Sequence, residues 1–363
     1  MSVWDFANAN LKNLHVYEPG KPIEEVAREL GLDPATIVKL ASNENPLGPS
    51  PLAVAAMRQA AGRMHIYPDG ASFELASAIA KKQGVEYNNL ILGNGSNEII
   101  EFLYHGFTQR GRSSVIASRY CFAVYKLMAE LFDVTFIEAP DQNFAHDLAA
   151  MRAAIRPDTK LIFITNPNNP TGARVTNEEL EQFVFSVPRH IVIALDEAYY
   201  EFCQHPPDTL GWIRRGANIV ALRTFSKIQG LAGLRIGYGM ARADTISVLQ
   251  RCRQPFNINA MAQAAALAAV GDAEHERRTR ELNFAGLERL AQFAKARGIV
   301  SVPSHANFMM LKVGDSRRMF VELQKRGVII RCMNSYGLPE WIRVTIGTPA
   351  EMEKFEQALI QCL

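Results

Sequence analysis

Short apolar runs alternate with stretches of helical pattern between about residue 90 and residue 240. Six of these runs are bounded by turn residues, which predicts buried strands at 90–92, 114–117, 134–137, 161–164, 191–195 and 219–222. Helical patterns lie between them, at 97–107, 122–131, 146–155 and 177–185. The alternation predicts βαβ units and therefore an α/β fold, with a mostly parallel sheet covered by helices.

The pattern changes from about residue 257 onward. A long helical stretch at 260–297 is rich in Ala, Glu, Arg and Leu. After it come predicted strands and a closing helix, at 308–311, 328–331, 342–345 and 350–363 respectively. Short strands mixed with helices outside the main alternation predict a second, smaller α+β domain.

The chain has 363 residues, which is long enough for two domains. We expect an N-terminal arm and part of the small domain at 1–40, a large domain at 41–256 and the small domain at 257–363. The first part of the arm contains Pro19, Gly20 and Pro22, so we expect it to be extended.

The composition argues against several classes of function. The net charge is +2 and the Lys and Arg residues are scattered, so neither nucleic acid nor a membrane surface is an expected partner. Apolar runs are too short to span a bilayer. The five cysteines and eight histidines lack metal-ligand spacing, and we expect no metal site. The odd cysteine count and the absence of a signal peptide predict a cytoplasmic protein.

Lys227 follows the last strand of the alternating region. Open α/β sheets bind ligands at the carboxyl ends of their strands, and a lysine held there can form a Schiff base with an aldehyde. Thr224, Ser226 and Arg235 add hydroxyl and guanidinium groups that suit a phosphate ester. A ligand with both an aldehyde and a phosphate suggests pyridoxal phosphate. The alternative interpretation is an ordinary solvated strand end.

A glycine-rich turn, GNGSNE at 93–98, follows the first predicted strand and opens a helix. Glycines let the backbone approach an anion, and the free amides of a helix N-terminus point toward it, here at Ser96 and Asn97. The turn fits neither the dinucleotide nor the nucleotide triphosphate motif. The alternative is a helix cap without a ligand.

Two further strand ends carry polar side chains. The turn NPNNPTG at 166–172 is rigid and would fix amides such as that of Asn169, although an ordinary turn is the alternative. Asp196 ends a buried strand and needs a partner, such as a protonated pyridine nitrogen that makes a cofactor ring an electron sink. Tyr199 could reach the phenolic oxygen of that ring. A helix cap is the alternative role of Asp196.

Aromatic and basic residues complete the candidate site. Phe122 begins a helix and could stack on a flat ring, while a core position is the alternative. Tyr67 lies in the turn YPDG. Arg331 and Arg343 lie in predicted strands, where a guanidinium could bind a carboxylate or phosphate or form a surface ion pair.

These strand ends, in this order, resemble the fold-type I pyridoxal phosphate enzymes, and specifically the class II aminotransferases. The resemblance covers about residues 15–347 and is greatest to the histidinol-phosphate aminotransferase family, in the segments ASNENPLGPSP, YPDG, LGNGSNE, NPNNPTG, LDEAY, TFSK, GLAGLRIGYG and WIRVTIG. It implies a large domain with a seven-stranded, mostly parallel sheet and a smaller α+β domain. The implied reaction is transamination of L-histidinol phosphate with 2-oxoglutarate, giving imidazole acetol phosphate and L-glutamate in histidine biosynthesis.

The resemblance implies a role for each matching residue. Lys227 would bind the cofactor and then move a proton as general base and acid, and Asp196 would pair with the pyridine nitrogen. Asn169 and Tyr199 would bind the phenolic oxygen, and Phe122 would stack on the ring. The phosphate would be held by Ser96, the amide of Asn97, Thr224, Ser226 and Arg235.

The resemblance also implies a homodimer and a substrate site. Tyr67 would reach the phosphate of the cofactor in the neighbouring subunit. Arg343 would bind the carboxylate of glutamate in one half-reaction and the phosphate of histidinol phosphate in the other, assisted by Arg331 and by Tyr17 from the arm.

Three departures from the family pattern affect the expected substrate more than the cofactor. Asn97 replaces a common Asp, Gln229 replaces a common aromatic residue, and residues 119–121 replace a proline-containing segment. An aromatic amino acid aminotransferase and a threonine-phosphate decarboxylase-like lyase are therefore alternatives. The non-enzymatic alternative is a regulator that carries an aminotransferase-like domain. It would need an added DNA-binding segment before Trp4.

Overall fold

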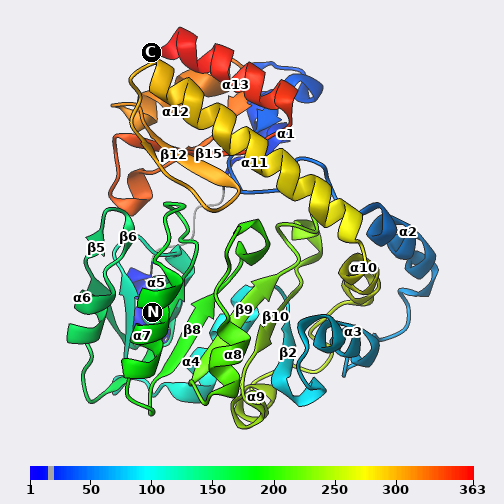
Figure 1. Cartoon of the computed structure of the whole chain (residues 1–363), viewed down its shortest axis with the longest axis vertical. Helices are drawn as coiled ribbons and strands as arrows, with labels where there is room; N and C mark the ends of the chain where they lie inside the picture. The colour runs from blue at the N-terminus through cyan, green and yellow to red at the C-terminus, as the bar shows by residue number, and fades with distance from the viewer. Residues whose placement is uncertain (15–19) are drawn as a thin grey trace.

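The structure is a computed structural model that describes residues 1–14 and 20–363 (Figure 1). Tyr17, the predicted substrate residue of the arm, lies outside the described residues. A seven-stranded sheet with its helices forms one end of the molecule in Figure 1, and a smaller sheet beneath α11, α12 and α13 forms the other. These helices comprise Ala273–Ala296, Ser316–Lys325 and Pro349–Cys362.

The large sheet confirms the predicted α/β fold. Its strand order is β2-β10-β9-β8-β7-β3-β4, and all strands are parallel except β10 (Gly237–Met240), which is antiparallel to both neighbours. The other six strands are the six predicted runs: β2 (Leu90–Gly93), β9 (Ile219–Thr224), β8 (Val192–Asp196), β7 (Thr159–Thr165), β3 (Ser114–Ser118) and β4 (Thr135–Ala139). The seventh strand escaped prediction because Gly237 and Gly239 interrupt its apolar pattern.

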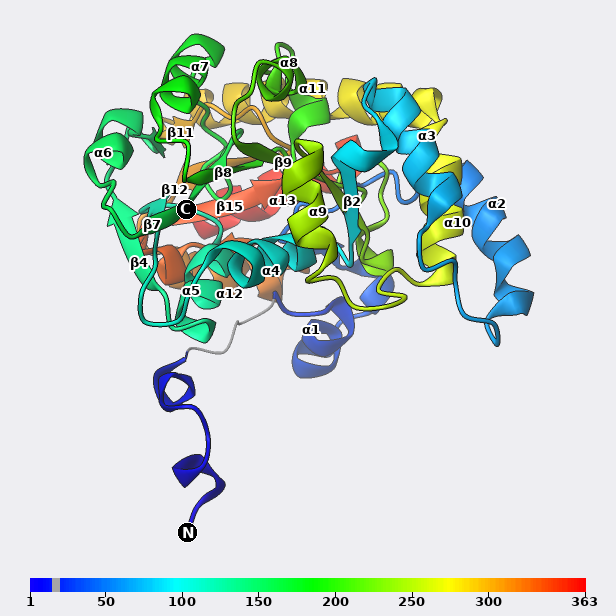
Figure 2. The same ribbon diagram turned by 90° about the horizontal axis from the view of Figure 1, so that it is seen from below.

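Two hydrophobic clusters cover the two faces of this sheet, as strand alternation requires. In β8, Ile193 and Leu195 pack on one face, while Val192 and Ala194 pack on the other. Figure 2 shows the helices of the first face, α6, α7 and α8, on the opposite side of the sheet from α4 and α5. Their bounds are Leu148–Ala153 for α6, Asn177–Ser186 for α7, Thr209–Arg214 for α8, Ser96–Phe107 for α4 and Ala123–Leu131 for α5. The second face is completed by α9 (Ala243–Gln250).

The smaller sheet has four antiparallel strands in the order β11-β12-β15-β14, at Ser301–Val302, Phe308–Lys312, Trp341–Thr345 and Arg331–Cys332. Nearby, β1 (Val38–Lys39) pairs in parallel with β13 (Val328–Ile329). This pairing attaches the segment that follows α1 (Ile23–Leu30) to the C-terminal part of the chain. A separate hairpin joins β5 (Asp141–Gln142) and β6 (Ala145–His146).

Two predicted elements were wrong. The strand predicted at 328–331 is split into β13 and β14, which pair with different partners, β1 and β15. The helix predicted at 260–297 is two helices, α10 (Ala260–Val270) and α11, because Gly271 ends the first and Asp272 caps the second by accepting from the backbone N–H of His275.

Helix α10 packs with the large sheet rather than with the small one. Its buried alanines belong to the same core as the large-sheet strands, and it lies against α2 (Pro51–Ala60) and α3 (Phe73–Gln83). The division of the chain at residue 256 stays a prediction, and this packing favours a change of core membership nearer Gly271.

The described start of the arm, residues 3–13, is not extended as expected. It forms two short 3-10 helices, Val3–Asp5 and Ala9–Asn13, and the first has a capping box between Ser2 and Asp5. The chain start projects away from the body in Figure 2, whereas Asn10 of the second helix donates to the carbonyls of Glu130 and Leu131 at the end of α5. Among the described residues, no helix is long and apolar enough to cross a membrane.

Candidate active site

A cavity of about 250 Å³ lies at the carboxyl ends of the parallel strands. It brings together all the cofactor residues predicted from the sequence except Tyr67, namely Ser96, Asn97, Phe122, Asn169, Asp196, Tyr199, Thr224, Ser226, Lys227 and Arg235. Its lining also includes residues to which the sequence assigned no role: Ser42, Glu44, Thr165, Ala198 and Ala232. Residues spread over almost 200 positions thus meet because parallel strands end at one edge of the sheet.

Lys227 is half-buried at the cavity and is poised for nucleophilic chemistry. Its Nζ donates to the backbone carbonyl of Ser42 over 3.3 Å and lies 5.8 Å from the centre of the Tyr199 ring. Burial, together with the positive charge of Arg343, lowers the pKa of Lys227 to about 8. A lowered pKa makes the neutral, nucleophilic amine accessible near neutral pH.

Asp196 is buried with a hydrogen bond to each carboxylate oxygen. The Tyr125 hydroxyl donates to Oδ2 over 2.7 Å, and the backbone N–H of Ala198 donates to Oδ1 over 3.1 Å. Burial raises the pKa of Asp196 to about 6, although both hydrogen bonds favour the charged form. A cationic partner in the cavity would relieve this cost of burying a carboxylate.

The three asparagines of the 166–172 turn have different roles. Asn166 accepts from the backbone N–H of Val175, and Asn168 donates to the carbonyl of Tyr120, so both hold the turn in place. Asn169 alone lines the cavity, where its Oδ1 accepts from Nη1 of Arg343 over 2.6 Å. The turn is therefore a support that presents one amide.

Tyr199 and Arg343 are both held by hydrogen bonds with residues 41–43, the segment that follows β1. Asn43 donates from Nδ2 to the Tyr199 hydroxyl over 2.9 Å, and Arg343 donates from Nη2 to the carbonyl of Ala41 over 2.9 Å. Burial raises the pKa of Tyr199 to about 12, so its hydroxyl stays protonated and can donate a hydrogen bond. Arg331 faces Arg343 in the register of β14 and β15, which places both side chains on the same face.

An anion cradle lies at the start of α4. Ser96 and Asn97 are its first two residues, and Gly95 before them has a φ of 75°. A Cβ atom added at Gly95 would lie 2.6 Å from Nη2 of Arg235, so only glycine lets the guanidinium approach the helix N-terminus this closely. Backbone amides, a helix dipole and a guanidinium suit a phosphate.

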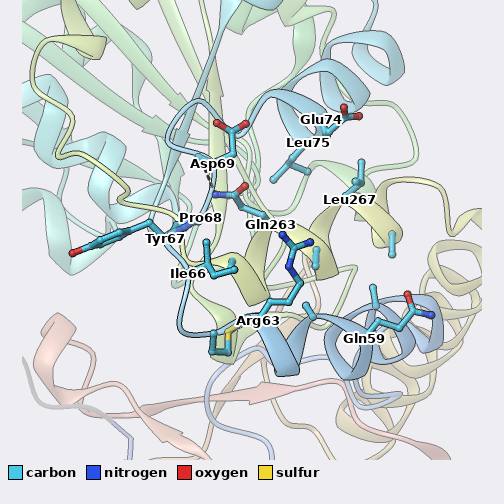
Figure 3. Close-up of a pocket in the computed structure, with 16 residues that line it drawn as sticks. Gln59, Arg63, Ile66, Tyr67, Pro68, Asp69, Glu74, Leu75, Gln263 and Leu267 are labelled. Atoms are coloured by element: carbon cyan, nitrogen blue, oxygen red, sulfur yellow. Dashed lines mark hydrogen bonds between the residues drawn. The ribbon is translucent and has the colours of Figure 1, made fainter.

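Phe122 and Tyr67 occupy contrasting positions. Phe122 lines the cavity as the residue before α5 and packs edge-to-face on Tyr125, with ring centres 5.7 Å apart. Tyr67 lies outside the cavity, is 81% exposed and stacks on Phe256 at 4.9 Å. It borders a separate hollow of about 640 Å³ between α2 and α10, and its ring points away from the other lining residues (Figure 3).

Comparison with known proteins identifies the family. Residues 35–359 match the family described as aminotransferase class I and II. The chain belongs to the class I and II aminotransferases.

Individual aminotransferases resemble the chain over its whole length. A histidinol-phosphate aminotransferase of Akkermansia muciniphila is 49% identical, with complete coverage of both chains. A second, histidinol-phosphate aminotransferase 1 of Dechloromonas aromatica, is 46% identical with the same coverage. Among solved structures, the histidinol-phosphate aminotransferase of Sinorhizobium meliloti in complex with pyridoxal 5'-phosphate has a TM-score of 0.90, 26% identity, and coverage of 99% of this chain and 98% of that one.

The aminotransferase cavity has the features that a phosphorylated pyridine aldehyde needs. The glycine-lined approach of Arg235 to α4 fits the phosphate, the buried carboxylate of Asp196 fits a ring cation, and Lys227 fits the aldehyde. Among the described residues, no group of three or more His, Cys, Asp or Glu side chains is arranged to hold a metal ion.

Sequence reasoning missed the residues that support this aminotransferase site. Tyr125 follows Phe122 by three positions, so helical spacing alone places both on one face, which was an available signal. Asn43 lies in the ASNEN segment but has no local pattern that predicts a contact with Tyr199, 156 residues away. Such long-range supports depend on tertiary structure.

Proposed function

We propose that this aminotransferase transfers the amino group of L-histidinol phosphate to 2-oxoglutarate, with pyridoxal phosphate as cofactor. The products are imidazole acetol phosphate and L-glutamate, and the reaction serves histidine biosynthesis. Full-length relatives at 44–49% identity carry the name of this enzyme. The observation that carries the proposal is the single cavity that gathers Lys227, Asp196, Asn169 and the anion cradle.

We assign the cofactor contacts from the positions of the side chains. Asp196 holds the pyridine nitrogen, Asn169 and Tyr199 hold the phenolic oxygen, and Phe122 covers the ring. The phosphate is bound by Ser96, the amide of Asn97, Thr224, Ser226 and Arg235. When bound, the cofactor supplies an electron sink that stabilises negative charge at the substrate carbon.

Lys227 acts as the proton carrier of the reaction. Its Nζ, with a pKa of about 8, removes the proton from the substrate carbon that bears the amino group, holds it, and would return it to the carbon on the other side of that nitrogen. The hydrogen bond to the Ser42 carbonyl keeps the amine near the strand end between these transfers. Tyr199 donates a hydrogen bond to the phenolic oxygen because its raised pKa keeps its hydroxyl protonated.

Arg343 is the proposed anion-binding residue for both substrates. It is buried, it is fixed by Asn169 and Ala41, and its guanidinium carbon lies 5.0 Å from the centre of the Phe308 ring. Such a fixed guanidinium suits the carboxylate of glutamate and the phosphate of histidinol phosphate alike. Arg331 lies on the same face and assists. A role for Tyr17 stays a prediction.

We propose a homodimer in which Tyr67 reaches the site of the neighbouring subunit. Tyr67 does not reach the cavity of its own chain, and the large apolar side chains near it are exposed: Met64, Ile66 and Phe256. A patch of this kind supports a protein interface. A cytoplasmic location is also proposed, supported by five free cysteines.

Substrate competition tests the proposed function. We expect glutamate to form from 2-oxoglutarate at a much higher kcat/KM with histidinol phosphate than with phenylalanine. Threonine phosphate should release no carbon dioxide. Preferred turnover of phenylalanine, or carbon dioxide release, would refute the substrate assignment.

A further inference from the structure

A buried ion pair ties the ends of β8 and β9 together on the side of the sheet away from the cofactor contacts. Arg223 Nε donates to Oε2 of Glu197 over 2.9 Å, and the two side chains are 3% and 0% exposed. Burial disfavours the Arg223 cation, but the Glu197 carboxylate together with Glu201 and two nearby tyrosines outweighs this effect and raises the pKa of Arg223. Because desolvation offsets the attraction in such pairs, stability alone does not account for it.

Further contacts fix the pair in position. Glu197 also accepts from the Thr209 hydroxyl in α8, and Arg223 donates to Oε1 of Gln83 in α3 over 2.7 Å. The Arg223 guanidinium lies 3.5 Å from the centre of the Tyr200 ring. Gln83 in turn donates to the Tyr238 hydroxyl in β10. Hydrogen bonds through Arg223 and Gln83 therefore connect the neighbouring strands β8, β9 and β10.

The strand alternation links this pair to the cofactor site. Asp196 directly precedes Glu197, and Thr224 directly follows Arg223. Neighbouring side chains of a strand point to opposite faces, so a carboxylate and a hydroxyl in the cavity are backed by the ion pair on the other face. The backbone N–H of Glu197 donates to the carbonyl of Leu222 over 2.8 Å, which extends the pairing of β8 with β9 by one residue beyond Asp196.

We propose that Glu197 and Arg223 are positioning residues that set the separation between Asp196 and the segment from Thr224 to Lys227. This inference rests on the proposed function of the cavity. Asp196 and Lys227 act on different atoms of one rigid ring, so an error in their separation misplaces the reacting atoms. Misplacement by about 1 Å lowers rates by up to about 100-fold.

The test replaces both charges by methionine, in Glu197→Met/Arg223→Met. Replacing both members of a buried pair by apolar residues of similar size preserves folding in other proteins, whereas removing one leaves an unpaired charge. The matched control is Arg289→Met/Glu356→Met, which removes a two-bond pair between α11 and α13 in the small-domain region. The three proteins are compared by thermal unfolding, by kcat and KM, and by the pH midpoint of the visible band of the lysine-bound cofactor.

We expect the Glu197/Arg223 double variant to unfold near the wild-type temperature, with kcat lowered about 10- to 100-fold and KM changed less than about threefold. The pH midpoint of the cofactor band should move in this variant and not in the control. A folded variant with wild-type kcat and pH midpoint would overturn the proposal.

A second variant decides the question if the double variant does not fold. Thr209→Val removes one hydrogen bond to Glu197, and we expect kcat to fall about two- to fivefold with the same shift of the band. An unchanged band and kcat in this variant would overturn the proposal. The band reports on the lysine and cofactor without any substrate, so inactivity of the wild type toward histidinol phosphate would refute only the proposed substrate.

Discussion

Replacing Tyr125 by Phe should make the stability of the apoprotein more sensitive to pH. The Tyr125 hydroxyl donates to Asp196 over 2.7 Å and favours its charged form, so its loss raises the pKa of Asp196 further. Tyr125 is fully buried, stacks on Phe163 at 4.5 Å and loses no ring contact in the change to Phe. The substitution therefore removes a hydrogen bond with little change in packing.

The magnitude follows from the linkage between protonation and folding. The pKa of Asp196 rises from 3.8 to about 6 on folding, so the folded state keeps its proton to higher pH than the unfolded state. This stabilises the folded state below pH 3.8, and the benefit, about 3 kcal/mol, is lost as the pH rises through about 6. A hydrogen bond to a charged group contributes about 1.5–3 kcal/mol, so Tyr125→Phe should cost about 1 kcal/mol at pH 7, about 1.5–2.5 kcal/mol at pH 8, and much less near pH 4.

Urea unfolding of cofactor-free protein between about pH 4 and pH 8 measures this effect. Tyr104→Phe is the matched control, because it removes a buried hydroxyl that donates to the Tyr125 carbonyl and not to Asp196. Its cost should not vary with pH. In an Asp196→Asn background, the cost of Tyr125→Phe should no longer vary with pH between about pH 4 and pH 8. An equal loss at both ends of the pH range for Tyr125→Phe would refute the reasoning.

Three further variants test the site. Lys227→Ala should fold but lose transamination and the visible cofactor band. In the wild-type apoprotein, attachment of the cofactor should accelerate as the pH rises through about 8, the pKa of the Lys227 amine. A rate of attachment that does not vary with pH would contradict this role. Arg343→Ala should raise KM for both substrates more than about tenfold while cofactor affinity changes little, and selective loss of cofactor would count against the assignment. Mixing inactive Tyr67→Ala and Lys227→Ala subunits should restore activity, because one site of the mixed dimer regains both residues, whereas no recovery would place Tyr67 in its own subunit's site.

The sequence predicts the large sheet well because its strands are continuous apolar runs that end in polar turns. Those turns converge because parallel strands share one edge, which explains why Ser96, Asn169, Asp196 and Lys227 line one cavity. Where local patterns were ambiguous, prediction failed: the glycine-interrupted strand β10 was missed.

Long-range contacts account for the other errors. The strand predicted at 328–331 is divided because its first half, β13, pairs with β1 and its second half, β14, pairs with β15. The supports of the site, including Tyr125, Asn43 and the Glu197–Arg223 pair, are defined by neighbours far away in the sequence. Periodicity and propensity carry no information on such partners, so these roles emerge only from the folded structure.

The central claim is that Lys227 and its surrounding cavity take the amino group of histidinol phosphate. The most direct measurement is the absorption spectrum of the purified, cofactor-loaded protein during a single half-reaction. We predict that histidinol phosphate bleaches the visible band of the lysine-bound cofactor and that 2-oxoglutarate restores it. Bleaching by phenylalanine but not by histidinol phosphate would contradict the account.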